Sequence, residues 1–67
     1  MQKTERKFRR GQSVEIVGKA NNGDTSAIGK VETVCYCYGR GHYEVAPHRD
    51  SPDSKFRTFH ARALRAV

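Results

Sequence analysis

The chain has 67 residues, with 13 Lys or Arg against 7 Asp or Glu and a formal net charge of +6. A chain this short forms one small domain, which argues against a deep catalytic cleft within a single copy. It also lacks any apolar run approaching the about 20 residues of a membrane-spanning helix. The basic N-terminus is not followed by the apolar segment of a secretory signal. We therefore expect a cytoplasmic protein that does not associate with membranes.

The basic excess lies at the two ends of the chain. Residues 1–10 carry a net charge of +4, residues 11–53 carry −2, and residues 54–67 carry +4. This distribution is typical of proteins that bind a polyanion, such as RNA, DNA or an acidic protein surface. We expect residues 1–7 to form a flexible basic arm and residues 8–67 to form the domain. If the fold brings the two ends together, their charges make one basic patch.

The first half of the domain reads as a strand, a loop and a longer strand. Residues 13–17 alternate apolar and polar side chains, which predicts a half-buried strand. Residues 18–27 are rich in Gly, Asn, Asp and Ser and predict a loop of about ten residues, long enough to be a functional surface. Residues 28–38 are rich in β-branched and aromatic residues, which predicts a strand. Val31 and Val34 fall on opposite faces under strict alternation, so a bulge or bend between them is needed to turn both inward.

The second half begins with a tight hairpin. The glycines of residues 39–42 predict a turn that places Arg40 at its tip. Residues 43–46 read as the returning strand, residues 47–54 as a loop, and residues 55–60 as a further strand. Residues 61–64 predict a single helical turn before the last strand. We assign Tyr43 and Phe56 to the core and treat Phe59 as a surface residue.

Five short strands in so few residues favour closure into a small barrel, because an open sheet of this size leaves exposed edges. The predicted fold class is all-β: a small five-stranded SH3-like barrel with one short 3-10 turn before the last strand. The spacing of glycines and aliphatic residues resembles the KOW type of this fold, whose members include ribosomal proteins and elongation factors. The residues that carry the resemblance are Phe8, Gly11, Val14, Ile16, Gly18, Gly29, Lys30, Val31 and Val34, together with the ending Phe59–Val67.

The layout is also similar to the plasmid-encoded dihydrofolate reductases, which are short SH3-like chains that assemble around a shared pore. That family's pore depends on a Val-Gln-Ile-Tyr run just before the last turn. Here the run is Phe56-Arg57-Thr58-Phe59, so the glutamine, isoleucine and tyrosine are absent. We do not carry the activity over, and we expect no catalytic residues and no cofactor.

The candidate binding residues are cations that can hold phosphates and aromatic rings that can stack on bases. They are Lys7, Arg9, Arg10, Lys19, Tyr36, Tyr38, Arg40, Arg57, Phe59 and Arg62. In KOW-like domains the loop corresponding to residues 18–27 often contacts the partner, which also makes Asn21 and Asn22 plausible contacts. Cys35 and Cys37 could join two histidines in a zinc site, but their spacing fits no usual motif, and we favour two reduced packing residues and no metal.

These features predict a non-catalytic domain that binds nucleic acid, with RNA slightly favoured over DNA. Two alternatives remain open. The first is a protein-interaction regulator encoded by a phage or another mobile element, which docks on a larger host machine. The second is an oligomeric enzyme of the plasmid reductase kind.

Overall fold

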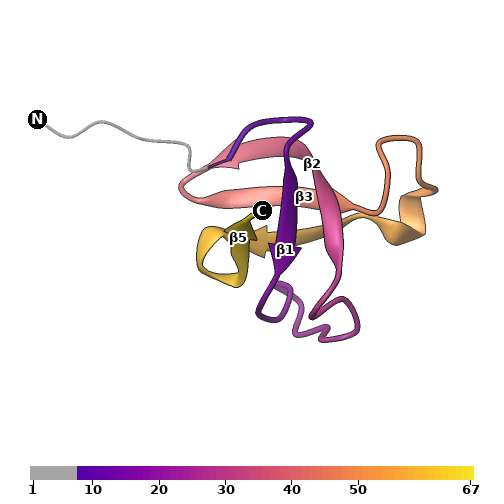
Figure 1. The fold of residues 1–67 in the computed structure, drawn as a ribbon. Coiled ribbons are helices and arrows are strands. Elements are labelled where there is room, and N and C mark those ends of the chain that lie inside the picture. Colours follow the sequence, from indigo (N-terminus) through magenta and orange to yellow (C-terminus); the bar gives the residue numbers. More distant parts are fainter. Residues whose placement is uncertain (1–7) are drawn as a thin grey trace, which may run out of the picture.

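A single antiparallel sheet of five strands forms the protein, and the computed structural model describes its residues 8–67 (Figure 1). The expected arm, residues 1–7, lies outside the described residues. The strands are β1 (Ser13–Ile16), β2 (Val31–Gly39), β3 (His42–Ala46), β4 (Arg57–His60) and β5 (Leu64–Ala66), in the sheet order β4-β3-β2-β1-β5. The 3-10 turns are η1 (Asp53–Lys55) and η2 (Ala61–Ala63). The all-β fold and the turn before the last strand are thus confirmed, and the sheet is compatible with an SH3-like barrel.

The first and last strands pair with each other. Val14 lies opposite Ala66 in this antiparallel pair, and Ile16 lies opposite Leu64. The predicted alternation in the first strand is confirmed, since Val14 and Ile16 are fully buried while Glu15 between them is half-buried. The fold therefore brings the folded segments near the two ends of the chain side by side.

The long strand β2 bends along its length (Figure 1). Its first residues pair with β1, and its later residues pair with β3. We expected a bulge or bend between Val31 and Val34 that turns both inward, but no register shift lies between them and only Val34 is buried. Val31 is exposed, and Glu32 instead shares the inner face with Val34. The register shifts occur later, between Val34 and Tyr36 and again near the hairpin. The first shift turns Tyr36 outward although it is two residues from buried Val34, which strict alternation does not predict.

The hairpin between β2 and β3 is a two-residue turn, as predicted. Gly39 pairs with His42, and the two residues between them, Arg40 and Gly41, have φ of 56° and 81°. Positive φ at both central positions is the type I′ geometry that matches the twist of a hairpin. Arg40 consequently lies at the exposed tip.

Strand β4 presents the opposite face from the one we expected. Phe59 is only 1% exposed, so the prediction of a surface stacking face at this position is wrong, and Phe56 is half-buried. The reason is the register with β3: Phe59 lies opposite buried Tyr43, and directly opposed residues share a face of the sheet. Tyr43 also packs edge-to-face on Phe8, with ring centroids 5.3 Å apart, and belongs to the core as predicted.

Candidate nucleic-acid interface

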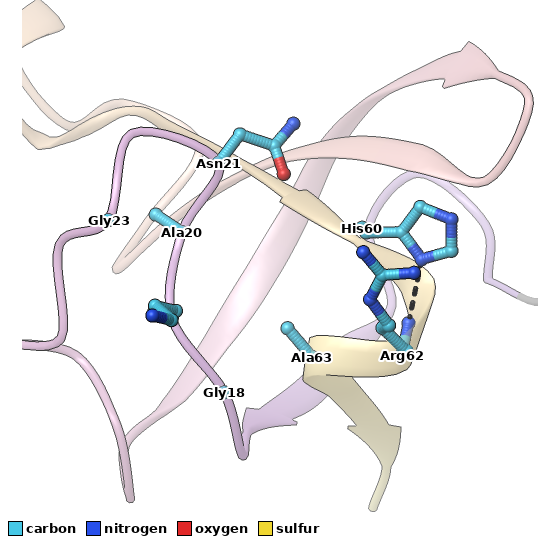
Figure 2. A pocket seen from close by; sticks show the side chains of 8 residues that line it. Gly18, Ala20, Asn21, Gly23, His60, Arg62 and Ala63 are labelled. Atoms are coloured by element: carbon cyan, nitrogen blue, oxygen red, sulfur yellow. Dashed lines mark hydrogen bonds between the residues drawn. The ribbon is translucent and has the colours of Figure 1, made fainter.

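A basic hollow lies between the loop that follows β1 and the turn η2. Its volume is about 540 Å³, and Figure 2 shows the loop residues on one side and His60, Arg62 and Ala63 on the other. Its lining residues are Gly18, Lys19, Ala20, Asn21, Gly23, His60, Arg62 and Ala63. We call it the basic hollow.

The loop is held against η2 by backbone hydrogen bonds. The amides of Val17 and Gly18 both donate to the carbonyl oxygen of Ala63, at 2.8 and 3.2 Å, and the amide of Asn21 donates to the Thr58 carbonyl oxygen at 2.8 Å. Gly18 permits this approach, because a Cβ at that position would lie only 3.1 Å from the Ala63 Cβ. Backbone hydrogen bonds therefore hold the loop just before Lys19 and again at Asn21.

Asp24 closes the same loop and pairs with Arg57. The Asp24 carboxylate accepts a hydrogen bond from the Ser26 amide at 2.9 Å and forms an ion pair with Arg57 Nε at 3.0 Å. The Ser26 hydrogen bonds, and to a smaller extent the charge of Arg57, lower the pKa of Asp24. We predicted that Arg57 holds a phosphate. Its side chain is only 17% exposed and engaged with Asp24, so it is placed to position the loop instead.

Two cations face the basic hollow without a partner of opposite charge. Within residues 8–67 the ion pairs are those of Arg57 with Asp24 and Arg65 with Glu15, so neither Lys19 nor Arg62 is neutralised by a described carboxylate. Both are exposed, and one comes from the loop and the other from η2. An anion between them meets positive charge from two elements, the loop and η2.

His60 lines the same hollow in a defined hydrogen-bonding state. Its Nδ1 accepts a hydrogen bond from the Arg62 amide at 3.2 Å, which caps η2 and leaves Nδ1 without a proton. Withdrawal from water, followed by the charges of Arg62 and His42, lowers the pKa of His60. The neutral ring is thus a structural element of the hollow at neutral pH.

A second hollow, of about 430 Å³, adjoins the first at the hairpin. Its lining residues are Asn21, Tyr38, Gly39, Arg40, His42 and Thr58. We call it the hairpin hollow. Asn21 lines both hollows, and its Nδ2 lies 3.1 Å from Nδ1 of His42. His42 contacts His60 edge-to-face with ring centroids 5.1 Å apart, so these three side chains join the two hollows.

Tyr38 gives the hairpin hollow an aromatic wall. It is 54% exposed and packs edge-to-face on Tyr36, which is 48% exposed, at a centroid distance of 4.8 Å. Partial removal from water raises the pKa of Tyr38, and the charge of Glu44 and a hydrogen bond to it act in the same direction. Tyr38 therefore stays a neutral phenol, and the carboxylate beside it disfavours an anion at this position.

The predicted site residues fall in several places. Lys19 and Arg62 line the basic hollow, and Tyr38 and Arg40 line the hairpin hollow. Arg9 is exposed, and Arg10 lines a separate small cavity of about 140 Å³ together with Gly11, Val34, Cys35 and Arg49. This cavity shares no residue with the other two, so these cations are not gathered in a single hollow. Lys7 lies outside the described residues.

The histidine pair is the feature that the sequence prediction missed. His42 and His60 are 18 positions apart, and they meet because they occupy paired positions of β3 and β4. From the sequence, His42, His48 and His60 are considered only as possible partners of Cys35 and Cys37 in a zinc site. Within residues 8–67 no three His, Cys, Asp or Glu side chains are grouped closely enough to hold a metal ion, and Cys35 and Cys37 are free thiols.

Comparisons with models of known protein families, with curated proteins and with solved structures found no match to this chain. The described part of the chain contains no helix of the length and apolarity needed to cross a membrane.

Proposed function

We propose that the protein is a non-catalytic nucleic-acid-binding domain of the KOW type, with RNA slightly favoured over DNA. The observation that carries the proposal is that the two hollows share Asn21. One is lined by two cations with no described ion-pair partner, and the other is lined by exposed Tyr38, which packs on Tyr36. Cations supply affinity for the phosphate backbone and aromatic faces supply stacking for bases.

The net charge and the cysteines support the same proposal. A formal charge of +6 raises the local concentration of a polyanion around the whole molecule. Cys35 and Cys37 are free thiols, which supports a reducing compartment such as the cytoplasm, where nucleic acids are accessible. The KOW assignment is supported by the glycine-bearing loop between β1 and β2, which supplies one wall of the basic hollow.

We propose that the protein is not catalytic because of the residues that stand at the positions of the reductases' Val-Gln-Ile-Tyr run. Phe59 stands where the plasmid reductases carry a tyrosine, and its ring is buried in the core of this chain. Arg57, in place of the glutamine, is paired with Asp24 within the same chain. Neither side chain is available to a pore shared between subunits.

The experiment is the affinity of short RNA and DNA oligonucleotides for the protein as a function of salt, measured by fluorescence anisotropy. We expect binding at low salt that weakens steeply towards physiological salt. Replacing both Lys19 and Arg62 by Gln should remove the phosphate contact of the basic hollow. The slope of log affinity against log salt should then fall by about 0.7 to 0.9, the value for one neutralised phosphate.

The matched control is the variant carrying Lys30→Gln and Lys55→Gln, which removes the same charge from exposed positions outside both hollows. We expect it to retain most of the slope. No binding of RNA or DNA at low salt, or an equal loss in the two variants, contradicts the proposed surface.

A protein-interaction module is the second candidate, because exposed aliphatic side chains gather where β1 ends and β2 begins. Val17, Ile28 and Val31 are 43%, 47% and 58% exposed. The end of β1 is hydrogen-bonded to this segment, with the Gly29 amide donating to the Ile16 carbonyl oxygen at 2.8 Å. A pull-down that retains one defined protein partner after nuclease treatment would favour this function.

A further inference from the structure

We propose that the two adjoining hollows form a site for one nucleotide of a single strand, with a phosphate in the basic hollow and an unpaired base in the hairpin hollow. This inference rests on the proposed nucleic-acid binding and adds the form of nucleic acid that is recognised. The basic hollow has a volume of about 540 Å³, and the hairpin hollow is a more open depression of about 430 Å³.

Charge assigns the phosphate to the basic hollow. Lys19 and Arg62 reach this hollow from two elements that the Ala63 carbonyl oxygen ties together. The carboxylate that the loop carries, that of Asp24, is engaged by Arg57 and by the Ser26 amide. The basic hollow thus offers positive charge that is not already balanced, and a phosphate is the group of a nucleotide that requires it.

Ring chemistry assigns the base to the hairpin hollow. The exposed face of Tyr38 can stack on any base, and the Arg40 guanidinium at the turn can stack or bind edge atoms. Glu44 lies beside the Tyr38 hydroxyl and repels a phosphate. The same carboxylate does not oppose a neutral base. One hollow is therefore positively charged, as a phosphate requires, and the other is aromatic, as a base requires.

The proposed nucleotide places its sugar at the junction between the two hollows. Asn21 borders both hollows, and the edge-to-face contact of His42 with His60 continues from one to the other. The backbone amide of Asn21 donates to the Thr58 carbonyl oxygen, and its side-chain Nδ2 contacts His42 Nδ1. One amide side chain is thereby presented to a ligand that occupies both hollows.

This arrangement predicts a preference for single strands. A base can enter a hollow beside Tyr38 only when it is unstacked and unpaired, which costs little in a single strand and more in a duplex. A duplex still contacts Lys19 and Arg62 through its phosphates. We therefore expect single-stranded oligonucleotides to bind more tightly than duplexes of the same sequence at equal salt.

The test compares labelled ten-nucleotide single strands of RNA and DNA with the corresponding duplexes, using the full chain at low salt. Tyr38→Leu should weaken single-strand binding by about tenfold, as expected for loss of one base–aromatic stack. It should change duplex binding less than twofold. Tyr38→Phe keeps the ring and should bind like the parent protein. Tyr36→Leu, the same change on the same strand outside the hairpin hollow, should cost less than Tyr38→Leu.

Circular dichroism of each variant confirms that it is folded before binding is measured. The one-nucleotide site is overturned if duplex and single strand bind equally, or if Tyr38→Leu costs no more than Tyr36→Leu. In either case a continued loss on replacing Lys19 and Arg62 leaves the proposed nucleic-acid binding standing. If no oligonucleotide binds at low salt, both proposals fail together.

Discussion

His60 is the residue at which several properties of the candidate site converge. Its Nδ1 accepts the hydrogen bond that caps η2, its ring contacts His42, and it lines the basic hollow with Arg62. A Cβ on Gly41 would lie 3.2 Å from His60 Nε2, so the hairpin turn also packs closely on the ring. Protonation of Nδ1 removes the cap and adds a positive charge to a hollow that Lys19 and Arg62 already line.

Stability should therefore fall as the pH falls through the histidine range. The pKa of His60 is lowered in the folded protein from its ordinary value of 6.5, so the unfolded chain takes up the proton first. The stability that the neutral ring contributes is present above about pH 6.5 and is lost on acidification towards the lowered pKa. Urea unfolding at pH 7.5 and pH 5.5 should show a smaller free energy of unfolding at the lower pH.

The His60→Asn variant separates the cap from the titration. Asn can accept the same hydrogen bond from the Arg62 amide but does not titrate, so the loss of stability between the two pH values should shrink. His48→Asn, at an exposed position outside both hollows, serves as the control and should retain the loss. An unchanged pH dependence in His60→Asn would show that another group governs it.

The loop between β1 and β2 is the element on which the site depends most. Its position rests on the hydrogen bonds to Ala63 and Thr58 and on the ion pair of Asp24 with Arg57. Because Arg57 lies on β4, this pair links the loop to the far edge strand of the sheet order. Arg57 is thus a positioning residue of the candidate site.

Removing this ion pair should cost more than removing the exposed one. Arg57→Gln should lower the free energy of unfolding by about 1 kcal/mol, since hydrogen bonds to charged groups contribute roughly that much or more when their partners are largely shielded. Arg65→Gln removes the pair with Glu15, in which the Arg65 side chain is 66% exposed, and should cost at most about 0.5 kcal/mol. Urea unfolding measures both, and equal costs would contradict the anchoring role of Arg57.

Local pattern predicted the elements better than it predicted their faces. Alternation located β1 and β4, and glycines located the hairpin, because these signals act within a few residues. The face of β4 depends on pairing with β3, and the segment carries a phenylalanine on either face, Phe56 and Phe59. The bulge after Val34 also depends on the partner strand. The local sequence does not indicate which residues of the partner strand will lie opposite, so neither feature could be predicted from it.

Within residues 8–67, the basic side chains near the two ends of the domain lie in separate places on the whole molecule. Pairing of β1 with β5 brings the first and last strands side by side. The cations then separate into two environments, because Arg10 lines a cavity with Arg49 while Arg62 faces Lys19 across the basic hollow. The sequence predicted Lys19, Tyr38, Arg40 and Arg62 individually, but their grouping around Asn21 and the histidine pair depends on tertiary contacts.

Binding of nucleic acid over the two hollows can be located residue by residue with amide chemical-shift mapping. A ¹⁵N-labelled sample titrated with a short single-stranded RNA at low salt should show its largest shifts in three segments. They are residues 18–23, 38–42 and 60–63, which supply most of the lining of both hollows. Largest shifts around Ile28 and Val31, around Arg10 and Arg49, or no shifts at all would contradict binding at this site.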